Sequence, residues 1–122
     1  MPSEKQIVDA FEKVASEMNG FIAASLVDID SGMTLGLKSS RPEFDLAAAS
    51  AYNSEMVKQK LKIMKALNLR TTLEDMLITL GDQIHVIKMV SPTTFIYLSV
   101  DRSQSNLAIV RNVLNKHVAA FL

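Results

Sequence analysis

Hydrophobic side chains recur every three or four residues near the start of the chain, which is the spacing of one helical face. These side chains are Ile7, Ala10, Phe11, Val14 and Met18. Ser3 and Gln6 have the spacing of a capping box, in which each side chain accepts a hydrogen bond from the other residue's amide. Asn19 and Gly20 supply the left-handed conformation that ends many helices. The pattern predicts a first helix between Ser3 and Gly20.

Five short runs rich in apolar and β-branched residues predict strands. The turn residues at 30–32 are close enough to join the first two runs into a hairpin. The last three runs are joined at 81–83 and 91–94, and these connections are too short for parallel crossovers. We therefore expect an antiparallel meander. The five runs are 21–30, 33–39, 73–80, 84–90 and 95–101.

Two further helices complete the predicted order αββαβββα, over a single domain of residues 1–122. One is expected from about Phe44 to Leu67, and the last is expected to begin at a cap on Ser103 or Ser105. The first and last strands are apolar on both faces, which predicts helices on both sides of the sheet. The side chains expected on one side of the last helix are Leu107, Val110, Leu114, Val118 and Phe121.

The helix predicted at 44–67 has an apolar stripe broader than a helix packed on one core needs. At 100° per residue, Asn53 and Lys60 lie on a polar seam between two apolar bands. In one interpretation the helix lies in a deep groove and both bands contact its own sheet. Burying Asn53 and Lys60 without partners would cost free energy. We therefore favour one band on the sheet and the other on a second protein. The first band is Ala49, Tyr52, Met56, Ile63 and Leu67, and the second is Leu46, Val57, Leu61 and Met64.

Charge and composition exclude several classes of partner. Thirteen basic and thirteen acidic residues cancel, so the chain lacks the basic excess that attracts nucleic acid or acidic membranes. The absence of cysteine excludes a disulfide framework and a thiolate zinc site and fits a reducing compartment. The N-terminus lacks a signal-peptide pattern, and no apolar run approaches the ~20 residues that span a bilayer. We expect a cytoplasmic protein.

Two stretches resemble ligand-binding loops without meeting their requirements. Asp28–Met33 begins like a calcium loop, but its glycine comes one position early and its twelfth position is Ser39. A hairpin turn is the better interpretation. Gly32–Ser39 resembles a phosphate loop, but Leu37 replaces the glycine before Lys38 and the stretch has the pattern of a strand.

The two histidines do not predict catalysis. His85 lies on a predicted strand, where a lone histidine is usually packed or solvated, and His117 lies near a helix end whose negative dipole favours it. A triad of Ser99, His85 and Asp101 can be written down, but no nucleophile elbow supports it. We expect no enzyme activity and no cofactor or metal.

Lys58, Lys62 and Lys65 mark the side of the 44–67 helix opposite its apolar stripe. A solvated face is the favoured interpretation. A modest basic ridge for an acidic partner is the alternative.

The sequence as a whole resembles the Roadblock family of dynein light chains and small-GTPase regulators. The strongest match is "GFIAASLVDIDSGMTLG" (20–36), which has the family's glycine, apolar strand, aspartate–glycine turn and second apolar strand. The stretches "FDLAAASAY", "LEDMLITLGDQIHVIKMV" and "FIYLSVDRSQSNLAIVR" fit the rest. The resemblance implies an α/β (α+β) sandwich with a five-stranded antiparallel sheet of order 2-1-5-4-3. It places the central helix on one face and the two terminal helices on the other.

The resemblance also implies a homodimer made by pairing the central helices and the strands that follow them. In this chain that strand is 73–80, which would lie at an exposed sheet edge, and such edges invite pairing. A heterodimer with a related subunit remains an alternative. The candidate interface residues are Leu46, Asn53, Val57, Lys60, Leu61, Met64, Met76, Leu77 and Ile78.

Three functions follow in order of preference. The first is a non-enzymatic homodimeric adaptor that binds a small Ras-like GTPase, or a subunit of a motor-type complex, through its paired central helices. The second is a PAS- or profilin-like sensor domain with a small-molecule pocket lined by Phe95, Tyr97 and Met89. The third is a hydrolase.

Overall fold

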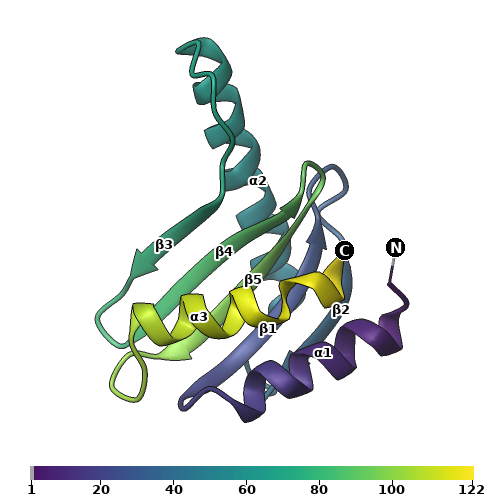
Figure 1. Cartoon of the computed structure of the whole chain (residues 1–122), viewed down its shortest axis with the longest axis vertical. Helices are drawn as coiled ribbons and strands as arrows, with labels where there is room; N and C mark the ends of the chain where they lie inside the picture. Colours follow the sequence, from purple (N-terminus) through teal and green to yellow (C-terminus); the bar gives the residue numbers. More distant parts are fainter. Residues whose placement is uncertain (1) are drawn as a thin grey trace.

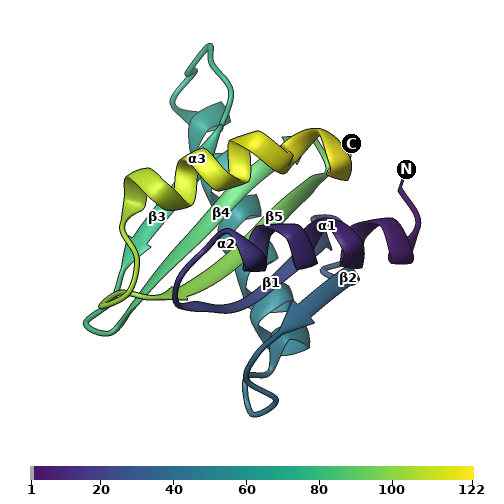
Figure 2. The ribbon, with the colours of Figure 1, turned by 60° about the horizontal axis from the view of Figure 1, so that its bottom comes forward.

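The sheet has five antiparallel strands in the order β2-β1-β5-β4-β3, which confirms the predicted topology. In the computed structural model, which describes residues 2–122, helices α1 and α3 cover one face and α2 lies against the other (Figures 1 and 2). The elements are α1 (Glu4–Ser16), β1 (Phe21–Asp28), β2 (Thr34–Ser39), α2 (Leu46–Ala66), β3 (Asp75–Thr79), β4 (Gln83–Ser91), β5 (Thr94–Asp101), α3 (Leu107–His117) and a final 3-10 turn (Val118–Phe121).

Helix α1 begins as its sequence predicts and ends earlier. The capping box is present, with the Gln6 amide donating to Ser3 Oγ at 3.2 Å and the Ser3 amide donating to Gln6 Oε1 at 2.8 Å. The helix stops at Ser16 rather than at Asn19. Gly20 has a φ of +79°, and a Cβ at this position would lie 2.9 Å from Cβ of Gln104. The glycine therefore lets the start of β1 pass close to the β5–α3 loop.

The cap predicted for the last helix is wrong. Asn106 is the N-cap of α3, and its side chain accepts a hydrogen bond from the amide of Ile109 at 3.0 Å. Ser103 is unavailable because its hydroxyl and amide both donate to the carboxylate of Asp101. Ser105 Oγ is buried and has no hydrogen-bond partner among the described residues.

The core between the sheet and the terminal helices joins α1 and α3. Phe11 of α1 and Phe121 at the chain end are both buried, with ring centroids 4.6 Å apart. Val110 and Leu114 are the buried residues of α3. These side chains cover Ile96, Leu98 and Val100 on one face of β5.

Helix α2 lies closest to β1 and β2, and its buried side chains Leu46 and Val57 share a core with Ile87 of β4 and with Phe95 and Tyr97 of β5. Small side chains allow this close approach, since Ser25 of β1 and Ser50 of α2 are completely buried and their hydroxyls lie 3.1 Å apart. Thr34 of β2 donates to the same Ser50 hydroxyl at 3.0 Å. The helix runs on past the end of the sheet, and its last turns and the following connector project from the body of the domain (Figure 1).

Candidate interaction surface

An exposed apolar strip runs along one side of α2, and we name it the helix flank. Tyr52, Ile63 and Leu67 are exposed, with 77%, 39% and 64% of their surface accessible, while Ala49 and Met56 are half-buried. One side of the helix thus presents large apolar groups to solvent at Tyr52 and, three turns later, at Ile63 and Leu67, while Ala49 and Met56 also pack against the core. Such patches usually mark a protein contact.

The helix flank is not the band that the sequence assigned to a partner. Leu46, Val57 and Met64 were expected at an interface, but they are 5%, 0% and 8% exposed. Leu46 and Val57 belong to the core between α2 and the sheet, and Leu61 is half-buried against it. The second band packs inward because the side of the helix that carries it also carries the buried Ser50, which contacts Ser25 of β1.

The sheet beside the helix flank forms a second surface, which we name the sheet floor. Met76 and Ile78 of β3 lie opposite Ile87 and His85 of β4, so all four side chains share the α2 face of the sheet. Met76, Ile78 and His85 are half-buried, whereas Ile87 is fully buried in the core beneath α2. The sheet floor is therefore the accessible part of this face, at Met76, Ile78 and His85. Leu77, expected at the same interface, points to the opposite face and packs against the core under α1 and α3.

Strand β3 is the edge of the sheet and has free backbone groups. The amide of Leu80 donates to the Gln83 carbonyl at 2.8 Å, and the amide of Met89 donates to the Glu74 carbonyl at 3.0 Å. Antiparallel hydrogen bonds alternate along a strand. The amides of Asp75, Leu77 and Thr79 therefore face away from β4, toward the open edge.

A chain of polar groups joins the helix to the sheet floor. His85 Nδ1 lies 3.3 Å from the Tyr97 hydroxyl, and His85 Nε2 lies 2.7 Å from Gln83 Oε1. Burial raises the pKa of Tyr97 to about 12, and the neighbouring Asn53 side chain opposes this shift. Asn53 is half-buried, whereas Lys60, the other seam residue, is exposed. Desolvation lowers the pKa of His85 and the charge of Asp82 opposes this shift.

This chain of polar groups is not a hydrolase triad. Ser99 Oγ donates to Gln83 Oε1 at 3.0 Å rather than to His85. Asp101 instead accepts hydrogen bonds from Ser103. The residues 2–122 contain no group of three or more His, Asp or Glu side chains that could hold a metal ion. No helix described here has the length and hydropathy to cross a membrane.

The calcium-like stretch is a turn. The carboxylate of Asp28 accepts hydrogen bonds from the amide and hydroxyl of Ser31, at 2.9 and 2.6 Å. These bonds lower the pKa of Asp28. Gly32 has a φ of +73°, as a tight turn at this point requires.

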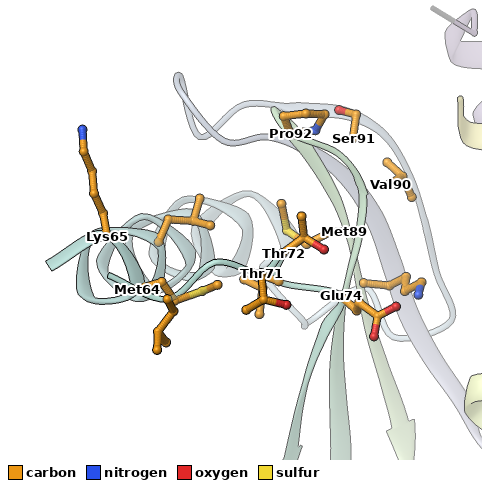
Figure 3. A pocket seen from close by; sticks show the side chains of 13 residues that line it. Met64, Lys65, Thr71, Thr72, Glu74, Met89, Val90, Ser91 and Pro92 are labelled. Atoms are coloured by element: carbon orange, nitrogen blue, oxygen red, sulfur yellow. The ribbon is translucent and has the colours of Figure 1, made fainter. Parts of the chain in front are cut away.

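The pocket expected for a sensor domain does not form. Phe95 and Tyr97 are 0% and 1% exposed and belong to the packed core. Met89 alone of the three lines a groove, which lies at the projecting end of α2 (Figure 3). We name it the tip groove. Its lining residues are Leu61, Met64, Lys65, Leu69, Thr71, Thr72, Leu73, Glu74, Lys88, Met89, Val90, Ser91 and Pro92.

Comparison with solved structures decides what fold this is. A Roadblock/LC7 domain from Streptomyces avermitilis superposes with a TM-score of 0.81 at 11% identity, covering 93% of this chain and 92% of that one. The chain has the Roadblock/LC7 fold. The gliding protein MglB from Thermus thermophilus gives a TM-score of 0.82 at 15% identity, covering 96% and 86%. A structure of MglB with a tetrameric arrangement gives 0.83 at 15%, covering 96% and 85%.

Comparison by sequence gives no match. No family model matches the chain, and no curated protein matches it. The Roadblock resemblance is therefore carried by the order of elements and by the strand order of the sheet, both of which the structure confirms.

Proposed function

We propose that this chain is a non-enzymatic cytoplasmic adaptor that forms a homodimer through α2 and β3 and binds a small Ras-like GTPase on the paired helices. The observation that supports dimerisation most directly is the corner between the helix flank and the sheet floor. These two surfaces consist of apolar side chains that a single protomer leaves accessible, on α2 (Tyr52, Ile63 and Leu67) and on β3 (Met76 and Ile78).

A second copy of the chain fits this corner by symmetry. In a two-fold dimer, the α2 of one protomer covers the sheet floor of the other, and the two β3 edges can pair through their free amides. Among the sequence candidates, Met76 and Ile78 remain contact residues in this proposal and Lys60 lies at its rim. The tetrameric arrangement of the MglB structure lends support, since that protein with the same fold self-associates.

The proposal of a GTPase partner rests on the Roadblock resemblance. Regulators of this kind act by contact, which agrees with a site built from apolar and uncharged side chains rather than catalytic ones. A regulator must also bind the GTP and GDP states with different affinities, because equal affinity cannot shift the equilibrium between them.

Light scattering tests the dimer. We expect twice the mass of one chain at micromolar concentration, and Ile63→Asp should give the mass of one chain because it places a charge in the apolar corner. Ile109→Asp on α3 is the matched control, since Ile109 is 45% exposed and Ile63 39%. A wild-type protein that stays monomeric, or equal loss of dimer in both variants, would contradict the proposal.

Titration calorimetry tests the GTPase step. The Ras-like GTPase encoded nearest to this chain is loaded with GDP or with a non-hydrolysable GTP analogue and titrated with the wild-type protein. We expect binding to one nucleotide state to be at least about tenfold tighter, a difference of about 1.4 kcal/mol. Binding that is equal in both states, or unchanged in the monomeric Ile63→Asp variant, would count against regulation by the paired helices.

A further inference from the structure

The tip groove lies on a different side of α2 from the helix flank. Its helical wall is made by Leu61, Met64 and Lys65, its opposite wall by the connector from Leu69 to Glu74, and its end by the β4–β5 hairpin (Figure 3). The groove has a volume of about 640 Å³, which is within the range of ligand pockets. Its apolar lining includes Met64 on the helix and Met89 on the α2 face of β4.

The helix and connector that form this groove are rich in positive charge in a chain that has no net charge overall, although Lys58 lies elsewhere on α2, where its Nζ donates to the Asp30 carbonyl. The stretch 56–73 contains Lys58, Lys60, Lys62, Lys65 and Arg70 and no acidic residue. Four of the five are exposed. Within residues 2–122 only Lys58 of this set forms an ion pair, with Glu55 at 3.3 Å. Lys65 and Lys88 line the groove and Glu74 is its one acidic residue.

The connector that forms the opposite wall has free backbone groups. Arg70, Thr71, Thr72 and Leu73 are neither helix nor ladder strand, and no backbone hydrogen bond joins them to another described residue. Their amides and carbonyls are open to a partner. A peptide in extended conformation can use such groups for main-chain hydrogen bonds.

We propose that the tip groove binds an extended peptide segment of a partner protein in which acidic and large apolar side chains alternate. The apolar side chains would enter the groove against Met64 and Met89, whose flexible thioethers adapt to different shapes. The carboxylates would face Lys65 and Arg70 on the rim. This surface goes beyond the proposed dimer and does not depend on it.

An extended peptide explains the concave groove, the exposed basic residues and the unbonded connector backbone better than a membrane surface does. A lipid surface would use the exposed lysines but not a concave apolar groove. It would also leave the open backbone of the connector, from Arg70 to Leu73, without partners at the apolar boundary, which is costly. Alternating side chains suit an extended peptide, because one side then meets the groove and the other meets the charged rim.

Fluorescence anisotropy tests the proposal on the full-length wild-type protein. The probe is a fluorescein-labelled peptide of alternating Asp or Glu and Leu, about ten residues and so at most about 35 Å long when extended. A second probe carries Lys at the acidic positions, and vesicles containing phosphatidylserine form a third. We expect micromolar binding of the acidic peptide only. Lys65→Glu/Arg70→Glu should weaken it about tenfold or more, since two contacts become repulsive.

Two matched controls separate the groove from general effects. Lys5→Glu/Lys13→Glu makes the same change in net charge on α1 and should leave the affinity within about twofold. Leu69→Ser on the groove wall should weaken binding several-fold, whereas Leu37→Ser on β2, with similar exposure (48% and 44%), should not.

Several results would overturn the proposal. They are no binding of the acidic peptide, equal binding of the lysine peptide, binding only to the vesicles, or equal effects of the groove and control variants. Light scattering on the same samples reports the oligomeric state, so failure of the groove and failure of the dimer are seen separately.

Discussion

Gly36 shows how closely α1 lies on the sheet. It sits on β2 beneath Ile7, and a Cβ at this position would lie 2.5 Å from Ile7 Cγ2 and 2.8 Å from Ile7 Cβ. The second distance involves an atom next to the helix backbone, so rotating the side chain cannot relieve the clash. Glycine is therefore required here by the close approach of the helix.

Gly36→Ala should lower the free energy of unfolding by about 1–3 kcal/mol, because α1 must move away from β2. Gly81→Ala is the matched control, since a Cβ there meets nothing within 4 Å and its φ is not in the left-handed region. Urea unfolding followed by circular dichroism measures both. Equal stabilities of the two variants would contradict this account of the packing.

His85 makes stability depend on pH. Its pKa in the folded state is lowered from 6.5 by desolvation, so the unfolded chain binds the proton more readily. The folded state is then favoured above about pH 6.5, and this contribution is lost as the pH falls through the lowered value. Gln83 and Tyr97 are its hydrogen-bond partners and Asp82 is the acidic group that opposes the shift.

His85→Gln should flatten the loss of stability on the acid side of about pH 6.5, because the titrating group is removed while an amide can still bond to its neighbours. Urea unfolding at a series of pH values measures the slope. His117→Gln is the control, since it leaves His85 in place. A wild-type slope in His85→Gln would show that other groups cause the pH dependence.

Helix α3 depends on one cap that its sequence leaves ambiguous. Three polar residues, Ser103, Ser105 and Asn106, precede it, and each is a good N-cap type. Asn106 is the N-cap, and Ser103 is not, because Ser103 is hydrogen-bonded to Asp101 in the preceding turn. This hydrogen bond forms in the folded chain, so the spacing of the three residues in the sequence does not identify the N-cap.

Asn106→Ala should destabilise the protein by about 1 kcal/mol, since the amide of Ile109 loses its acceptor. Ser105→Ala should leave stability unchanged or raise it, because it removes a buried hydroxyl without a partner among residues 2–122. Thermal unfolding distinguishes the two. A loss of stability in Ser105→Ala equal to that in Asn106→Ala would indicate that Ser105 has a capping role after all.

Helix α2 illustrates where sequence reasoning succeeds and where it stops. Its periodicity correctly predicted a stripe too broad for one core. Which half faces the sheet depends on the rotation of the helix about its axis, and this is fixed by the contact between Ser25 and Ser50. Small polar side chains carry little signal in a hydrophobicity pattern, so Leu46 and Val57 were assigned outward although they are buried.

The whole molecule is a sheet that its own helices cover unevenly. The element order and the strand order follow from short turns and apolar runs, and these were predictable from the sequence. The tip groove was not, because its walls come from 61–65, 69–74 and 88–92, which meet only in the folded chain. The accessibility of the sheet floor was likewise not predictable from the sequence, since it depends on where α2 crosses the sheet.

If a second copy covers this floor, the melting temperature must depend on protein concentration, because association stabilises the folded state by mass action. We expect the wild-type midpoint to rise by several degrees over roughly a hundredfold increase in concentration. The Ile63→Asp midpoint should stay constant, and Ile109→Asp should behave as wild type. Differential scanning fluorimetry measures all three, and a constant wild-type midpoint would contradict self-association.

The projecting end of α2 has a consequence for local motion. The last turns have fewer buried contacts than the rest of the helix, with Met64 the one buried side chain from Lys62 to Ala66, and short helical segments in water are marginal. Backbone amides near Lys62 to Ala66 should therefore exchange with deuterium far faster than those around Ser54, in the buried part of the same helix. Local unfolding at the end of α2 would allow this segment to change conformation when it binds a partner.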